Sequence, residues 1–449
     1  MLAVAALLLL GVVGLAVGAY WQVGRTPAEL IDYTKRRLQG HPKLEFVALP
    51  VLDLVRKALG EPDADDWKRP FAVPELPSPP QQPYRLALES DDPLLLRVGP
   101  GRRIASLSAA AKMAPEGAVI EIDPGDYRAD VAVWHQKRLT IRGLGSGARL
   151  IASGQSAEGK AIWVIRRGDF TIENIAFAGA RVHDRNGAGI RLEGGRLLVR
   201  NCRFFDNEAG ILVGNGDEIE LDVVDSEFSH IGAGDGLSHA IYVGTIKRFR
   251  LTGNYIHHAN IGHLVKSRAR KNRIEYNRLT DETGGRASYE LEFPNGGDTE
   301  VIGNVIQQGA GTQNSVIVSY GAEGYRWPLN RLVMVHNTIV NDRRYGGTFV
   351  RVSPGADLVW TRNNLWVGAG RLHLPAFADS AQDVKAGPDV FADAESHDYR
   401  LRREVRERWY LPSPLTGDMT PAAEYRHPAG TLALATPPRF PGAVQAAPD

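Results

Sequence analysis

Short apolar strands alternate with polar turns along most of the chain, and the pattern repeats. Five segments place a hydrophobic residue two positions after an asparagine: GNYI, YNRL, GNVI, HNTI and RNNL, which contain Asn254, Asn277, Asn304, Asn337 and Asn363. Each unit also holds a second short strand, such as HAIYVG, SYELEF or SVIVSY. A repeat of this length, built from short strands without helices, predicts a parallel β-solenoid. The equivalent asparagines are expected to stack from coil to coil, each side-chain amide hydrogen-bonding the next.

Two segments outside the repeats support the same fold. SLSAAAKMAPEGAVIEIDPGDY resembles the capping helix and first coil of right-handed parallel β-helix proteins of the pectate-lyase-like superfamily, and the asparagine ladder resembles theirs. DYRL and AEYRHP resemble the tail that follows such helices in bacterial carbohydrate-active proteins. The resemblance covers about residues 95–430 and implies an all-β, right-handed parallel β-helix solenoid with an N-terminal capping helix. It leaves the activity open, because this fold carries lyases, hydrolases, epimerases and non-catalytic adhesins.

The chain is expected to fall into four parts. Residues 1–22 form a transmembrane anchor or signal helix, because residues 2–19 are all apolar or glycine. Residues 23–94 contain short helices and a proline-rich linker, 95–375 form the β-helix, and 376–449 form a C-terminal tail that packs on it and ends in disorder. Basic residues follow the apolar run rather than precede it, which opposes export, whereas the fold favours export. We therefore expect a bacterial-type cell-envelope protein, anchored in the inner membrane and facing the periplasm, or secreted if the segment is cleaved.

Composition narrows the function classes. Lysine and arginine number 53 against 52 aspartates and glutamates, which argues against a nucleic-acid binder held by bulk charge. Cys202 is the one cysteine, so an intrachain disulfide is excluded, and its alignment with Ile175 of the preceding coil places it in the core. The oligomeric state is left open by the sequence.

Charged residues are concentrated on one predicted face of the solenoid. Side chains alternate along a strand, so residues out of phase with the apolar core positions face solvent. Adjacent coils are then expected to present Tyr242, Lys266, Arg268, Glu290, Glu292 and Ser319 outward. His263 shares the inward phase and is expected to be buried, while His257 and His258 are interpreted as turn residues.

This charged face allows two interpretations. In the first, Lys266 pairs with Glu290 and Arg268 with Glu292 in exposed ion pairs that contribute about 0.2 to 1 kcal/mol each. In the second, the face binds an acidic polysaccharide, and the glycine-rich loops PNGGDT and YGAEGY border a groove for it.

The second interpretation supplies the groups that β-elimination on a uronate polymer requires. Arg268 is suited to neutralise the sugar carboxylate, and Lys266 is the candidate base. Tyr242 or His239 is the candidate donor of a proton to the leaving oxygen. The expected substrate-binding residues are Arg270, Lys271, Glu290, Glu292 and Ser319, although the run that contains Arg270 and Lys271 also fits a solvated face.

The same residues loosely resemble the chondroitinase-B and alginate-lyase branch of the fold. There a lysine followed by serine is the base, an arginine assists, and two glutamates with an asparagine bind calcium. Lys266 and Ser267 match the lysine–serine pair, but the glutamate pair follows the lysine by one coil instead of preceding it, so only Lys266 is carried over. A Ca²⁺ site formed by Glu290, Glu292, Asn295 and Asp298 is an alternative use of these oxygen ligands, and no other cofactor is expected.

The sequence thus predicts a membrane-tethered or exported β-helix protein that acts on an acidic polysaccharide as a lyase. A uronate epimerase uses the same proton abstraction. A non-catalytic polysaccharide-binding or envelope-scaffold module needs no turnover. The sequence does not separate these three functions.

Overall fold

The structure, a computed structural model, describes residues 31, 42–58, 71–75, 90–312, 314–343, 346–411 and 417–448. The anchor expected at 1–22 lies outside these residues. Within them, no helix combines the length and the apolar character needed to cross a membrane. The helix α3 (Pro42–Ala58) precedes the β-structure.

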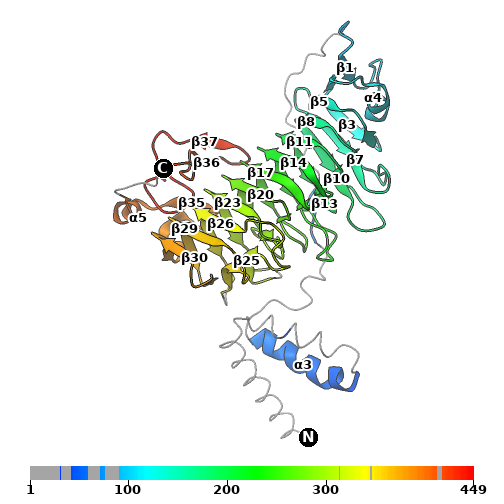
Figure 1. Cartoon of the computed structure of the whole chain (residues 1–449). Helices are drawn as coiled ribbons and strands as arrows, with labels where there is room; N and C mark the ends of the chain where they lie inside the picture. Colours follow the sequence, from blue (N-terminus) through cyan, green and yellow to red (C-terminus); the bar gives the residue numbers. More distant parts are fainter. Residues whose placement is uncertain are drawn as a thin grey trace.

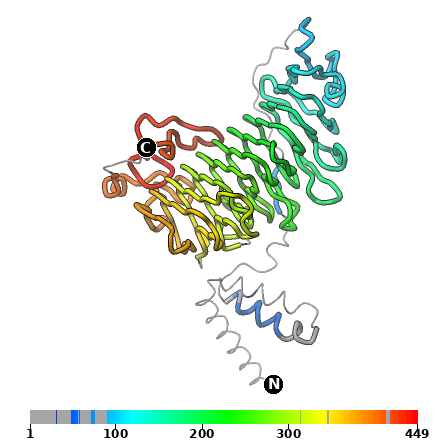
Figure 2. Tube along the Cα trace, viewed as in Figure 1, coloured from blue at the N-terminus to red at the C-terminus, as the bar shows by residue number. Residues whose placement is uncertain are grey.

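Three parallel sheets of 12, 11 and 10 strands wind into a right-handed β-solenoid of about ten coils (Figures 1 and 2). Sheet A consists of β1 (Leu95–Val98), β2 (Val119–Ile122), β5 (Arg138–Gly143), β8 (Asp169–Glu173), β11 (Arg196–Arg200), β14 (Gly216–Val224), β17 (Ile246–Thr252), β20 (Lys271–Glu275), β23 (Asp298–Ile302), β26 (Arg331–Val335), β29 (Leu358–Arg362) and β32 (Asp379–Ala381). Each strand pairs with its equivalent one coil away, so residues at the same position form columns along the solenoid.

The other two sheets complete each coil. Sheet B consists of β3 (Gly125–Arg128), β6 (Ala148–Ile151), β9 (Ile175–Ala178), β12 (Arg203–Phe205), β15 (Glu227–Ser229), β18 (Tyr255–His257), β21 (Arg278–Thr280), β24 (Val305–Gln308), β27 (Thr338–Asn341), β30 (Leu365–Gly368) and β33 (Val384–Ala386). Sheet C consists of β4 (Ala132–Trp134), β7 (Ala161–Ile165), β10 (Ala188–Leu192), β13 (Ala209–Val213), β16 (Ile241–Val243), β19 (Val265–Ser267), β22 (Leu291–Phe293), β25 (Val316–Tyr320), β28 (Thr348–Val352) and β31 (Arg371–His373).

The core is a column of stacked side chains inside the coils. The rings of Phe177, Phe204 and Phe228 stack in successive coils, with centroids 5.1 and 4.4 Å apart. Cys202 lies in the same interior and is 1% exposed, as its alignment with Ile175 predicts. Because every coil buries apolar side chains against the next, packing is continuous along the solenoid.

The asparagine ladder forms, with one correction. The side chains of Asn254, Asn277, Asn304 and Asn337 each donate to the next asparagine at 2.9 to 3.0 Å. The acceptor after Asn337 is Asn364, not Asn363 as the sequence pattern indicates. Asn363 has a φ of 54° and its side chain contacts His336 instead.

A helix contacts the first coils of the solenoid, and the C-terminal tail packs on its last coils. The helix α4 (Leu107–Met113) contacts the first coils in the segment expected to form the cap, and the Asp130 carboxylate accepts the Leu107 and Ser108 amide protons at 2.6 and 2.9 Å. Strands β32 and β33 extend the sheets past residue 375, where the β-helix is predicted to end. Beyond them, apolar residues of the C-terminal tail pack on the outer face of the last coils of sheet B.

The described part of the tail contains six short elements: η2 (Pro388–Val390), α5 (Arg403–Arg408) and the hairpin strands β34 (Phe391–Asp393) with β35 (Asp398–Leu401) and β36 (Ala423–Tyr425) with β37 (Thr431–Ala433). The β36–β37 hairpin turns back along the solenoid, where the Gly430 amide donates to the Gly253 carbonyl at 2.7 Å (Figure 1). The tail therefore reaches the coils that carry the predicted site.

Candidate functional site

A column of polar side chains runs along the outer face of sheet C. Tyr242, Lys266, Glu292 and Ser319 occupy equivalent positions in β16, β19, β22 and β25. The register therefore pairs Lys266 with Glu292, so the predicted pairs Lys266–Glu290 and Arg268–Glu292 are wrong. Buried residues flank these positions in each strand and face the core, which is why the column points outward.

The Lys266 and Arg268 side chains both contact the carboxylate of Glu323, which lies in the loop after β25. Lys266 Nζ lies 3.1 Å from Glu323 Oε1 and 3.0 Å from Glu292 Oε2. The Arg268 guanidinium donates to both oxygens of Glu323, at 2.5 and 3.0 Å. Arg268 also donates to the Tyr242 hydroxyl at 3.2 Å and to Asn295 Oδ1 at 2.7 Å. This is a bidentate arginine–carboxylate contact with a second cation beside it.

Glu323 is the residue that sequence reasoning missed. It lies in the glycine-rich YGAEGY loop after β25, where the sequence pattern gives no sign that its side chain reaches Lys266. The Glu323 amide donates to the Pro294 carbonyl at 2.9 Å, so the loop backbone is fixed over the preceding coil. The hydrogen bond from Arg268 and the charge of Lys266 lower the pKa of Glu323 to about 2. Its side chain is 45% exposed, against 13% for Lys266, so the carboxylate is the accessible partner.

Two stacked histidines adjoin the cluster. The rings of His239 and His263 are 4.4 Å apart, and the His239 ring also stacks near Tyr242 at 5.8 Å. The His263 amide donates to His239 Nδ1 at 3.0 Å, so a neutral His239 carries its proton on Nε2. Burial and the neighbouring His263 lower the pKa of His239 well below its ordinary value.

His263 is buried, as its inward phase predicts. Its Nε2 lies 3.0 Å from Glu292 Oε2, the same oxygen that Lys266 approaches. Burial lowers the pKa of His263, although the adjacent Glu292 acts in the opposite direction. The cluster thus combines two cations, two carboxylates and two histidines that favour the neutral form.

The prediction that Glu290 faces outward is wrong. Glu290 is fully buried, and Gln308 Nε2 donates to its Oε2 at 3.3 Å. Strand β22 begins one residue later, and the register aligns Glu290 with the buried Leu264 and Ile317 of neighbouring coils. Burial, reinforced by nearby Asp281, raises the pKa of Glu290 well above its ordinary value.

The other predicted residues are separated from Lys266. Lys271 begins β20 of sheet A, with the exposed Arg270 just before it. Asp298 also lies on sheet A, where Arg331 Nε donates to it at 2.7 Å. The predicted calcium ligands therefore do not converge, because Glu290 is interior and Asp298 faces a different side. Ser319 follows Glu292 in the column but is only 1% exposed.

The buried carboxyl groups give a pH prediction. Burial raises the pKa of Asp281 to about 7. The folded chain therefore keeps a proton that the unfolded chain releases near pH 4. The contribution of protonated Asp281 to the free energy of unfolding is fully present below pH 4 and is lost as the pH rises towards 7. The expected loss from Asp281 is about 4 kcal/mol.

Asp281→Asn is expected to remove this part of the pH dependence of stability. Glu290→Gln is also expected to reduce that pH dependence, because the pKa of Glu290 is raised too. The measurement is the thermal midpoint at pH 5 and pH 8 for the wild type, Asp281→Asn and the exposed control Asp217→Asn. Equal pH slopes in all three proteins contradict the prediction.

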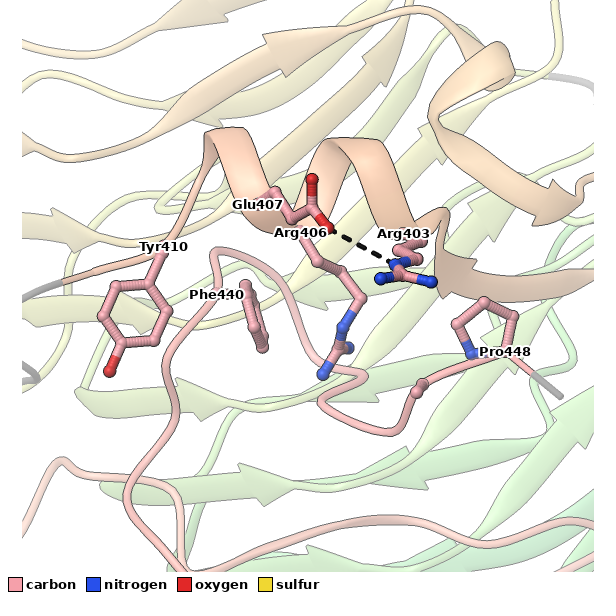
Figure 3. A pocket seen from close by; sticks show the side chains of 7 residues that line it. Arg403, Arg406, Glu407, Tyr410, Phe440 and Pro448 are labelled. Atoms are coloured by element: carbon pink, nitrogen blue, oxygen red, sulfur yellow. Dashed lines mark hydrogen bonds and ion pairs between the residues drawn. The ribbon is translucent and has the colours of Figure 1, made fainter.

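Two cavities lie away from this cluster, among the residues that the structure describes. One of about 630 Å³ is lined by α5 and the chain end, where the Arg406 guanidinium lies 4.0 Å from the Phe440 ring centroid (Figure 3). Another of about 410 Å³ lies on the outer face of sheet B and includes His230 and His257. On sheet C, the column from Tyr242 to Ser319 crosses four neighbouring strands, a layout that suits an extended chain.

Comparisons with known proteins agree with the architecture. Residues 188–365 match the family model described as the right handed beta helix region. The crystal structure of pectate lyase Pel9A superposes with a TM-score of 0.51 and 13% sequence identity, over 78% of this chain and 96% of that chain. A search of curated proteins found no match. At this identity the likeness establishes the fold. The chain therefore has the right-handed parallel β-helix fold, which it shares with pectate lyase Pel9A.

Proposed function

We propose that the cluster around Lys266 and Arg268 acts on a uronate-containing polysaccharide by β-elimination. The observation that carries the proposal is the grip of these two cations on the Glu323 carboxylate. A uronate carboxylate presents the same two oxygens, so a polymer that displaces the half-exposed Glu323 side chain finds an arginine fork already in place. The fold of pectate lyase Pel9A supports a polysaccharide-acting β-helix.

The cluster supplies each step of the elimination. Arg268 neutralises the sugar carboxylate, which makes the proton on the adjacent carbon more acidic. Lys266 takes that proton, and the electrons of the broken C–H bond form a carbon–carbon double bond as the bond to the leaving oxygen breaks. The leaving oxygen takes a proton from His239, whose neutral ring carries one on Nε2, or from the Tyr242 hydroxyl.

One observation favours a non-catalytic binding module instead. Lys266 Nζ already pairs with two carboxylates, at 3.0 Å from Glu292 and 3.1 Å from Glu323, an arrangement that serves binding without any reaction. Displacement of Glu323 by substrate removes one of these two carboxylates. The lyase thus depends on that displacement, whereas a binding module does not.

We also propose that the protein acts in the cell envelope, facing the periplasm, or is secreted from the cell. The apolar run at residues 2–19 supports this location, since it suits an anchor or a signal segment. A substrate made of exported polysaccharide is then in the same compartment. A requirement for Ca²⁺ stays a prediction. The assay described next tests it, because the assay is run with and without calcium.

The test is to incubate the full-length protein with a panel of uronate polymers, with and without calcium, and to follow ultraviolet absorbance. A lyase leaves an unsaturated uronide, so absorbance is expected to rise on at least one polymer. A flat trace across the panel contradicts elimination on those polymers. Solvent deuterium exchange at the sugar then distinguishes an epimerase, which incorporates deuterium, from a binding module, which does not.

A further inference from the structure

A second group of ionisable side chains lies on sheet B, away from the uronate site on sheet C. His257 ends β18, and His258 follows it with a φ of 52°. Consecutive strand residues point to opposite faces, but a left-handed residue interrupts that alternation. As a result the two imidazoles converge, and their Nδ1 atoms are 2.5 Å apart.

The outer nitrogens of both rings already have acceptors. His257 Nε2 lies 3.3 Å from the Glu227 carboxylate, and His258 Nε2 lies 3.2 Å from the Thr283 carbonyl. A carbonyl or carboxylate can only accept, so each neutral ring carries its proton on Nε2. Two Nδ1 lone pairs then face each other at a separation shorter than an ordinary N–H···N hydrogen bond of about 3 Å. Such an arrangement needs a positive charge between the rings.

A carboxylate completes the group. The ligand atoms of His257, His258 and Glu282 all lie within 4.8 Å of one another. Glu282 is fixed through its Oε1, which accepts from the Tyr255 hydroxyl at 2.6 Å and from Thr280 Oγ1 at 3.0 Å. Histidines oriented by a carboxylate and a carbonyl on their far nitrogens are typical of metal sites, where these outer contacts fix the tautomer.

We propose that His257, His258 and Glu282 bind a divalent transition-metal ion, and that Zn²⁺ fits this ligand set best. Two imidazoles and one carboxylate are borderline to hard ligands that suit zinc and leave a fourth position open. The 410 Å³ cavity adjoins this site through His257, which lines it together with Glu227. The site is independent of the uronate cluster, so either proposal stands without the other.

The linker before the solenoid lies beside this site. The Phe71 ring is 5.8 Å from the His230 ring, whose own ring stacks 5.0 Å from that of His258. The Arg286 guanidinium lies 5.0 Å from the Phe71 centroid. The neighbouring aromatic rings partly shield the site from water, which strengthens the attraction between a bound cation and Glu282.

The experiment is Zn²⁺ titration of the chelator-treated full-length protein by calorimetry, with Co²⁺ absorption as a report of tetrahedral nitrogen and oxygen ligands. One equivalent of Zn²⁺ is expected to bind, and His258→Asn is expected to weaken binding at least 100-fold. Glu282→Gln is a second variant that keeps the size of the side chain, in case a histidine variant does not fold. His183→Asn is the matched control, because His183 is fully exposed and also lies next to a carboxylate, at 3.2 Å.

Binding of one equivalent that survives in His183→Asn and is lost in His258→Asn or Glu282→Gln supports the site. Absence of binding in the wild type overturns it and leaves a shared proton between the rings. Equal affinity in the wild type and in the folded variants also overturns it, because the ion is then held elsewhere.

Discussion

Lys266→Ala is expected to lower the turnover of a uronate polymer by about 10²- to 10⁴-fold, the range that a positioned base contributes. Arg268 stays in place in this variant and still pairs with a carboxylate, so substrate binding is expected to survive largely intact. The loss should therefore fall on kcat, with a much smaller change in KM. The measurement is the initial rate of ultraviolet absorbance increase over a range of polymer concentrations.

Lys160→Ala is the matched control for this prediction. Lys160 also lies between two carboxylates, 2.8 Å from Glu193 and 3.7 Å from Glu158, but in an earlier coil. Its removal should leave the rate unchanged. If Lys266→Ala weakens binding while no polymer is turned over by the wild type, the module is a binder. If Lys266→Ala changes neither rate nor affinity, the site is misplaced.

Asn364→Ala is expected to destabilise the β-helix by about 2 to 4 kcal/mol. The fully buried Asn364 side chain accepts from the Asn337 amide and side chain and donates to the Met334 carbonyl, all at 2.9 Å. Alanine leaves the buried Asn337 backbone N–H without its acceptor, which costs about 1 to 3 kcal/mol. It also removes the hydrogen bonds to the Met334 carbonyl and to the Asn337 side-chain amide, which keeps the Val301 carbonyl as its second acceptor. The thermal midpoint and chemical denaturation of the full-length protein measure the effect.

The adjacent Asn363 provides the control. Its φ of 54° suits glycine, and it stands outside the ladder, so Asn363→Gly is expected to cost about 1 kcal/mol. A larger loss in Asn363→Gly than in Asn364→Ala contradicts the register of the ladder.

The regular part of the fold could be predicted from the sequence because two periods determine it. One is the length of the coil repeat, and the other is the two-residue alternation of side chains along each strand. The repeat length predicts a solenoid, strand alternation places Lys266 outward, and the alignment of Cys202 with Ile175 places Cys202 inward. It is harder to predict which of two adjacent residues occupies a given position in the coil. In RNNL both asparagines precede a hydrophobic residue at the same spacing, because Trp366 follows Asn364 as Leu365 follows Asn363, so the pattern does not choose between them.

Only the site residues that lie within regular strands, such as Lys266 in β19, could be placed from the sequence. Glu290 was misplaced because the alternation of SYELEF does not reveal that the strand begins at Leu291. Glu323 was missed because a loop brings it to Lys266 from 57 residues away, and no local pattern reports that contact. His257 and His258 read as turn residues, since their convergence depends on the left-handed backbone at His258.

The most direct test of the central claim, that Lys266 and Arg268 recognise a sugar carboxylate, is a binding measurement. A uronate oligosaccharide and its neutral counterpart, with the carboxylate reduced to an alcohol, are titrated into the wild type and Arg268→Ala. Arg351→Ala serves as the control, since Arg351 occupies the same column next to Ser319. The account predicts that the wild type and Arg351→Ala prefer the acidic sugar and that Arg268→Ala loses the preference. Equal binding of both sugars by the wild type, or an unchanged preference in Arg268→Ala, contradicts it.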